Sequence, residues 1–140
     1  KEVSISSAKE NIFDIAGIRV VCNFIDDVYA MADMMLEQND VRLIMKKDYI
    51  ESPKPNGYRS LHLVIAVPVF LLNGCEYVPV EVQIRTVAMD FWASLEHQLR
   101  YKKEKELSPQ VHQELKACAE ASAILDKRMQ LLFDEISKPG

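Results

Sequence analysis

Apolar and polar positions along the chain follow two periods, one typical of strands and one typical of helices. Residues 12–24, IFDIAGIRVVCNF, are rich in β-branched side chains and predict a buried strand. Residues 26–40 instead place Val28, Met31 and Met35 at helical spacing, which predicts a helix. The two aspartates that open this segment are expected to cap the helix and to favour its positive end.

Three further strands are expected after this helix. They cover residues 41–50, residues 58 to about 69, and residues 77–85. An Asn73-Gly74 pair separates the last two, and Asn-Gly is the strongest short signal for a β-hairpin. The second and third strands are separated by a loop with two prolines, which is followed directly by an apolar run.

Two helices are predicted to close the chain. Thr86 is expected to cap the first, which runs to about Lys102. Ser108 followed by Pro109 gives the second an N-cap and a proline at its first position, and this helix is expected to continue to Ile136. The order of strand, helix, three strands and two helices predicts a mixed α/β (α+β) fold. We expect a mixed sheet of about four to five strands, flanked by helices, with a long C-terminal helix.

Side chains of the two final helices mostly predict packing. In the first, the aromatic and apolar residues expected to pack onto the sheet are Phe91, Trp92, Leu95 and Leu99. His97 and His112 are expected to be structural or exposed. In the second, residues spaced alternately by four and three form a coiled-coil-like seam: Val111, Leu115, Cys118, Ser122, Leu125, Met129, Leu132 and Ile136. This seam predicts either packing on the chain's own sheet or a contact between subunits.

Composition narrows the class of protein. With 140 residues, 49% apolar and 27% charged, the chain matches one globular domain with a sizeable core. It has no uncharged apolar run of 18 residues, so we expect no membrane span, and the default compartment is the cytoplasm. The net charge of −4 disfavours binding to duplex nucleic acid. Three scattered cysteines argue against a disulfide framework and against a zinc cluster.

Alternation along the strands separates a core face from a polar face. In the strand of residues 77–85, valines and an isoleucine fill one face, and Glu81, Gln83 and Arg85 occupy the other. In the strand before it, Tyr58 and His62 share the non-core face with a serine. If the hairpin pairs these strands, the polar and aromatic side chains converge on one patch of the sheet. Arg19 and Asn23 lie on the corresponding face of the first strand, whereas Arg59 has core parity and is expected to reach around the edge.

Two explanations of this polar patch remain open. It is either the solvated face of an antiparallel sheet or a nucleotide site. For a nucleotide site, Asp14 and Glu81 supply oxygen ligands for Mg²⁺. Cationic or donor groups for phosphate oxygens are Arg19, Arg85, Lys54 and His62. Tyr58 offers a stacking plane for a base, and Asn56 could read the base edge.

Three segments resemble, in order and spacing, the synthetase domain of the RelA/SpoT family. They read DIAGIRVVC, DYIESPKPNGYRSLHLV and VPVEVQIRTVAMDFWASLEHQLRYK, and they span residues 14–102. The chain looks most like the small members that have a synthetase domain only. The resemblance implies a nucleotidyltransferase-like fold and a GTP diphosphokinase reaction. In that reaction, pyrophosphate moves from ATP to the ribose 3′-hydroxyl of GDP or GTP, giving the alarmone ppGpp or pppGpp and AMP.

The resemblance also implies residue roles. Asp14 and Glu81 would hold Mg²⁺, and Glu81 would help activate the 3′-hydroxyl, with Gln83 and Arg85 supporting the geometry of metal and phosphate. Six positions would bind substrate: Lys47, Lys54, Asn56, Tyr58, His62 and Arg19. Among them, Tyr58 would stack on guanine beside Asn56. Lys54 and His62 would face the acceptor nucleotide, assisted by Lys47, and Arg19 would meet the ATP phosphates.

One family feature is missing from the first 13 residues. The family carries a basic ATP-binding segment upstream of the DIAGIR strand, and residues 1–13 contain nothing similar. The predicted organisation is therefore a synthetase domain over residues 1–105 without that segment, and a C-terminal helix over residues 106–140. The resemblance implies a homotetramer formed through helices. Two other functions stay open: a catalytically incomplete module that binds guanine nucleotides or alarmones, and a related transferase with another acceptor.

Overall fold

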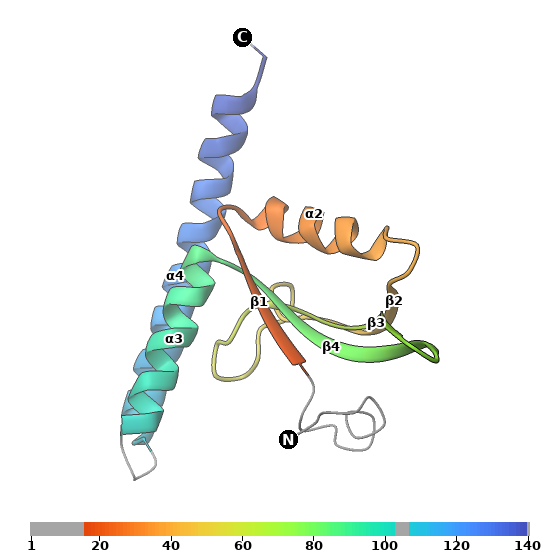
Figure 1. Ribbon diagram of the computed structural model, residues 1–140. Coiled ribbons are helices and arrows are strands. Elements are labelled where there is room, and N and C mark those ends of the chain that lie inside the picture. The colour runs from red at the N-terminus through yellow and green to blue at the C-terminus, as the bar shows by residue number, and fades with distance from the viewer. Residues whose placement is uncertain (1–15, 103–106, 140) are drawn as a thin grey trace.

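The computed structural model describes residues 16–102 and 107–139, which form one four-stranded sheet with three helices (Figure 1). The elements in chain order are β1 (Ala16–Cys22), α2 (Ile25–Leu36), β2 (Arg42–Asp48), β3 (Leu61–Leu71), β4 (Gly74–Thr86), α3 (Val87–Lys102) and α4 (Pro109–Ser137). The predicted fold class is confirmed, including the long C-terminal helix. Within the described residues no helix is both long and apolar enough to cross a membrane.

The sheet is mixed, with the strand order β1-β4-β3-β2. β3 pairs antiparallel with β4 and with β2, and β1 pairs parallel with β4. The parallel pair needs a crossover that connects β1 to the far side of the sheet, and α2 is the first part of that crossover. The predicted hairpin is therefore confirmed, and it forms the centre of the sheet.

The core lies between the sheet and α2. Leu61, Leu63, Val82 and Ile84 are fully buried on the predicted core face of the hairpin, and Val28 of α2 packs against them. β1 fits its predicted face less well, because Ile18 is half exposed although it shares parity with the buried Cys22. The three cysteines are free, as predicted. Burial raises the pKa of the Cys22 thiol, and nearby Asp27 raises it further.

Two local predictions shift by a few residues. The hairpin turn is formed by Leu72 and Asn73, and Gly74 already pairs with Leu71 at a positive φ of 139°. At the start of α2, Phe24 occupies the N-cap position without a side-chain hydrogen bond. Asp26 and Asp27 lie in the first turn, where they favour the positive helix end but do not cap it. The capping prediction for these aspartates is therefore wrong.

The two final helices pack mainly against each other. Trp92 of α3 is buried next to Ala119 of α4, and its indole Nε1 donates to the carbonyl oxygen of Leu115 at 2.7 Å. The expected packing of α3 onto the sheet through Phe91, Leu95 and Leu99 is wrong, because these three side chains are exposed. The caps are confirmed: Thr86 Oγ1 accepts from Met89 N, and Ser108 Oγ accepts from Val111 N.

The face of α4 that packs on the rest of the chain differs from the predicted seam. Ala119 and Asp126 are its buried residues, and near the C-terminal end Phe133 stacks on Phe24 with 4.4 Å between ring centroids. Most of the predicted seam points elsewhere: Cys118, Leu125, Met129, Leu132 and Ile136 are exposed. In Figure 1, α4 runs beside α3 and continues past the sheet. Among the described residues, these seam positions thus form an apolar stripe open to solvent.

A partly buried phenol connects α2 to the end of β2. Tyr29 Oη donates to Asp48 Oδ2 at 2.7 Å, while Asp48 Oδ1 accepts from the backbone N–H groups of Ile50 and Glu51. Burial raises the pKa of Tyr29 above its usual value, and the hydrogen bond to the Asp48 carboxylate raises it further. Asp48 therefore shapes the turn that leads into the proline-rich loop.

We expect Tyr29→Phe to lower the free energy of unfolding by about 1 kcal/mol near neutral pH, because one hydrogen bond is lost. The fold favours the neutral phenol. The contribution of Tyr29 is therefore fully present below the ordinary tyrosine pKa of about 10 and declines as the pH rises above it. Denaturant unfolding between pH 7 and about pH 11 should show a gap between the two proteins that narrows at the alkaline end. Tyr101→Phe, at an exposed tyrosine, is the control, and a gap independent of pH would contradict the assignment.

Candidate functional site

Four polar side chains form one row across the sheet. Lys47 of β2 pairs with His62 of β3, His62 pairs with Gln83 of β4, and Gln83 pairs with Arg19 of β1. Directly paired residues point to the same face of a sheet, so the row lies on the face opposite the core. Glu81 lies on the same face, two residues before Gln83. The register therefore brings together five of the predicted site residues.

A cleft of about 730 Å³ covers most of this row. Eight of the predicted site residues line its sheet and loop side: Arg19, Lys54, Asn56, Tyr58, His62, Glu81, Gln83 and Arg85. Helix α3 supplies the remaining wall. Lys47 continues the row beyond the cleft and is exposed. Asp14 lies outside the described residues. The cleft is large enough to hold a nucleotide-sized ligand.

A chain of hydrogen bonds holds the floor of the cleft. Tyr58 Oη accepts from Arg85 Nη2 at 2.9 Å, and the same nitrogen lies 2.8 Å from Gln83 Oε1. Gln83 Nε2 donates to Glu81 Oε1 at 3.1 Å. The loop tyrosine is thereby fixed to three polar residues of β4 without any ligand.

Asp90, in the first turn of α3, is a site residue that sequence reasoning missed. Its Oδ1 lies 3.1 Å from Arg85 Nη1 and 3.5 Å from Arg19 Nε. The Asp90 carboxylate therefore contacts two guanidinium groups from the neighbouring strands β1 and β4. An acidic residue just after Thr86 was a sequence signal for the start of a helix, but nothing in the sequence indicated its partners.

The loop between β2 and β3 is a folded turn over the cleft. Asn56 Oδ1 accepts from Tyr58 N at 2.9 Å, and Gly57 N donates to Lys54 O at 2.8 Å. Lys54 Nζ lies 4.9 Å from the ring centroid of Tyr49 and 5.1 Å from that of Tyr58. Because Asn56 already accepts one hydrogen bond at its oxygen, its amide N–H groups are the more available contacts for a ligand.

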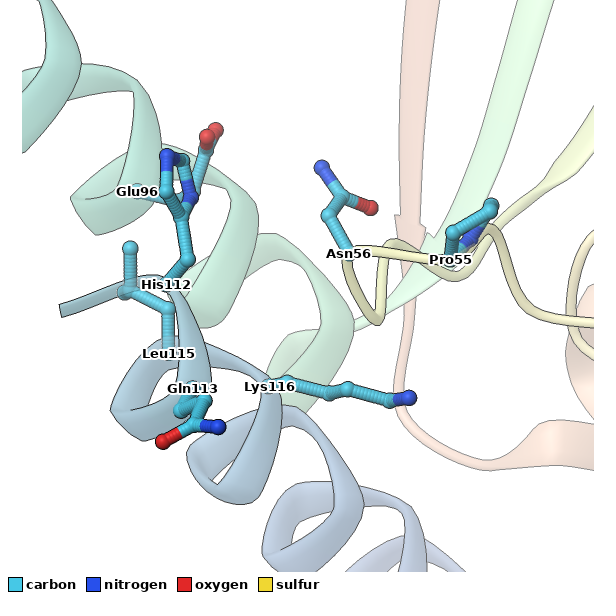
Figure 2. Close-up of a pocket in the computed structure, with 7 residues that line it drawn as sticks. All are labelled: Pro55, Asn56, Glu96, His112, Gln113, Leu115 and Lys116. Carbon is cyan, nitrogen blue, oxygen red and sulfur yellow. The ribbon is translucent and has the colours of Figure 1, made fainter. Parts of the chain in front are cut away.

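The tip of this loop also borders a smaller pocket of about 320 Å³ between it and the last two helices. Figure 2 shows Asn56 and Pro55 on the loop across from Glu96 of α3 and His112 of α4. Asn56 and Glu96 line both this pocket and the main cleft. The smaller pocket therefore adjoins the nucleotide-sized cleft at the loop tip.

The α3 wall of the cleft was not predicted as part of the site. Its polar residues are Ser94, Glu96, His97, Gln98 and Arg100. Glu96 is buried and holds Arg100 through two contacts, the shorter of 2.7 Å between Glu96 Oε2 and Arg100 Nε. His97 is exposed and stacks on Tyr101, as the expectation of a solvent-facing histidine allowed, but it also lines the cleft. The available signal was the polar segment EHQLR, in which Glu96 and Arg100 are four residues apart on the helix that follows the strand of site residues.

Two shielded nitrogen atoms in the cleft have no hydrogen-bond partner among the described residues: His62 Nε2 and Arg85 Nε. His62 Nε2 lies 3.5 Å from Glu81 Oε1, which is too far for a good hydrogen bond. Buried polar atoms are normally paired, and both residues line the cleft. They are therefore candidate contacts for an anionic ligand.

The donors present fit a metal that is shared with a substrate. The described residues contain no group of three or more histidine, cysteine or acidic side chains that could hold a metal alone. Mg²⁺ is commonly bound by one or two carboxylates plus phosphate oxygens and water. Glu81 is partly exposed in the cleft and uses only Oε1 in its hydrogen bond to Gln83, so it fits such a role.

We expect Gly57→Ala to destabilise the protein by about 2 kcal/mol or more, because overpacking and a left-handed backbone both oppose the new methyl group. Gly57 has a φ of +100°, and an added Cβ would lie 2.6 Å from Ala119 Cβ of α4. Thermal or denaturant unfolding measures the effect. Gly17→Ala is the matched control, since nothing lies within 4 Å of its Cβ position, and equal effects at both glycines would contradict the close approach.

The family model described as "Region found in RelA / SpoT proteins" matches residues 1–106. GTP pyrophosphokinase YwaC of Bacillus subtilis (strain 168) is 51% identical over 135 residues, which cover 96% of this chain and 64% of that protein. GTP pyrophosphokinase YjbM of the same strain is 39% identical over 129 residues, covering 92% of this chain and 61% of that protein. The chain thus spans less than two thirds of the length of these relatives.

Solved structures give the same result. The crystal structure of small alarmone synthetase 2 from Bacillus subtilis matches with a TM-score of 0.82 and 50% identity, covering 85% of this chain and 65% of that one. Small alarmone synthetase 1 from the same organism, bound to its product pppGpp, matches with a TM-score of 0.78 and 37% identity over 86% of this chain and 61% of that one. Fold, sequence and family model agree, and the chain belongs to the RelA/SpoT family.

Proposed function

We propose that the protein is a small alarmone synthetase. It would transfer pyrophosphate from ATP to the ribose 3′-hydroxyl of GDP or GTP and release AMP. The observation that carries this proposal is the row of His62, Gln83 and Arg19 beside Glu81, in a cleft that Tyr58 borders. Lys47 continues this row beyond the cleft. Two relatives that match over more than nine tenths of this chain bear the name GTP pyrophosphokinase.

The loop side of the cleft suits the acceptor nucleotide. Tyr58 offers its ring for stacking on guanine, with its hydroxyl held by Arg85. Lys54 lies next to that ring and His62 on the strand behind it, so both can meet the acceptor phosphates. Asn56 can donate its amide hydrogens to the base edge, since guanine presents a carbonyl oxygen there.

The opposite side suits the ATP phosphates. Arg19 lies on this side, and Arg85 lies between it and Tyr58. Both arginines contact Asp90, so their charges are oriented before the substrate arrives. Transfers of this type depend mainly on alignment and neutralisation of charge. Glu81 would accept the proton of the 3′-hydroxyl as that oxygen attacks, while Gln83 fixes the carboxylate.

Asp14 and Glu81 are the proposed ligands of Mg²⁺. The bound ion would neutralise phosphate charge. It would add to the stabilisation that the arginine and lysine side chains of the cleft provide. Glu81 fits this role, as its second oxygen is not used in the hydrogen bond with Gln83.

Assembly and compartment belong to the same proposal. The exposed stripe of α4, which includes Leu125, Met129 and Ile136, supports a homotetramer built through helices. The proposed compartment is the cytoplasm. Neither duplex nucleic acid nor a membrane is a proposed partner.

The full-length native protein should convert GDP to guanosine tetraphosphate in the presence of ATP and Mg²⁺, as measured by chromatography of the nucleotides. Glu81→Gln should lower the rate about 100-fold or more, because a proton acceptor is lost while the shape is kept. Glu37→Gln, at the end of α2, is the matched control and should leave the rate unchanged. Absence of product with GDP still bound would favour the alternative of a nucleotide-binding regulatory module.

Tyr58→Ala should weaken GDP binding by about 1 to 3 kcal/mol, the usual cost of losing one stacking contact. Tyr58→Phe keeps the ring and loses only the hydrogen bond from Arg85, so it should retain most of the affinity. Tyr77→Ala, an aromatic on the hairpin next to Arg42, is the control for removal of a tyrosine elsewhere. Calorimetric titration with GDP provides the measurement, and unchanged affinity in Tyr58→Ala would show that the acceptor base lies elsewhere.

A further inference from the structure

Three consecutive loop residues face alternately toward the cleft and toward α4. Tyr58 lines the cleft. Its two neighbours, Gly57 and Arg59, contact α4 instead: Gly57 lies against Ala119, and Arg59 reaches Ser122. The loop therefore presents its tyrosine to the cleft because the residues on either side are attached to the helix behind it.

A buried carboxylate on α4 forms the centre of this attachment. Asp126 Oδ2 lies 3.1 Å from Arg59 Nη2 and accepts a hydrogen bond from Thr86 Oγ1 at 2.8 Å. Arg59 Nη2 also donates to Ser122 Oγ at 2.8 Å. Asp126 and Arg59 are each only 5% exposed, and Thr86 is fully buried. These contacts join α4 to the loop and to the end of β4.

The same two chain segments are also joined on the cleft side. Tyr58 and Arg85 directly precede Arg59 and Thr86, and they form the 2.9 Å hydrogen bond at the floor of the cleft. The Asp126 carboxylate thus connects the loop to β4 on the α4 side, and the hydrogen bond between Arg85 and Tyr58 connects them on the cleft side. The distance between Tyr58 and the catalytic face of β4 is determined by both contacts together.

We propose that Asp126 is a positioning residue for the acceptor nucleotide: through Arg59 and Thr86 it holds the loop so that Tyr58 stands at the base-binding end of the cleft. This role rests on the proposed function, because it assigns Tyr58 to a guanine base. Asp126 itself lies behind the loop, is not among the residues that line the main cleft, and touches no substrate.

A purely structural role would have different consequences. Breaking a buried ion pair destabilises a fold strongly, since the remaining charge stays buried without its partner. Such a loss would affect all parts of the site alike. A positioning role instead changes the loop and the acceptor affinity, and it leaves binding of ATP at the opposite side of the cleft unchanged.

Hydrogen exchange of the loop amides tests the role without any nucleotide. Gly57 N donates to Lys54 O and Tyr58 N donates to Asn56 Oδ1, so both amides report on the loop turn. In Asp126→Asn we expect these amides to exchange about tenfold faster, as one charged hydrogen-bond partner is lost. Phe133→Ala is the matched control, because it loosens α4 at the Phe24 contact, away from the loop. Unchanged loop exchange in Asp126→Asn, or an equal increase in the control, would overturn the proposal.

A double-mutant cycle with GDP then tests the route through Tyr58. Asp126→Asn should weaken GDP binding about tenfold in the wild-type background, and less than about twofold when Tyr58 is already alanine. The KM for ATP should stay within about twofold. The same loss of GDP affinity in both backgrounds would overturn the proposal. If the full-length native protein makes no product from GDP or from GTP, the proposed function is wrong, whereas the exchange rates still decide whether Asp126 holds the loop.

Discussion

The antiparallel pairing of β3 with β4 is the contact on which the rest of the structure depends. Its register places Leu63 opposite Val82 and His62 opposite Gln83, so a single alignment fixes both faces of the sheet. A shift by one residue would move the apolar set to solvent and the polar set into the core. The core against α2 and the polar row in the cleft are therefore two consequences of the same pairing.

Contacts with α4 fix the conformation of the loop that carries Tyr58, which the sheet alone does not determine. The loop that carries Tyr58 leaves β2 through the turn built by Asp48 and enters β3 only at Leu61, so most of it has no strand pairing. Its contacts with Ala119 and Asp126 replace that pairing. Asp126 also lines an apolar groove of about 690 Å³ on the outer side, together with Phe91, Leu125 and Met129. Asp126 therefore contacts the loop that carries Tyr58 and also lines the groove beside the proposed subunit contact.

Sequence reasoning succeeded where a period or a turn signal was present. The two-residue alternation of β4 gave the correct core and polar faces, and Ser108 with Pro109 gave the correct start of α4. It failed where the deciding contact joins residues far apart in the chain. Arg59 has core parity, and its partner Asp126 is 67 residues away on a helix whose strongest pattern is the exposed stripe. Trp92 was expected on the sheet because aromatic spacing alone cannot distinguish a sheet from a neighbouring helix.

The charge of the whole chain is a poor guide to this site. The net charge is −4, yet Arg19, Lys54 and Arg85 converge on one cleft. Acidic groups are also present, but the structure uses Asp90 to hold two arginines. Without such a partner, neighbouring guanidinium groups would repel each other and spread into solvent. A phosphate that enters the cleft meets cations already held close together, so part of the ordering cost has been met during folding. Overall acidity and affinity for anions are therefore compatible, because a carboxylate such as Asp90 positions the cations that a nucleotide would bind.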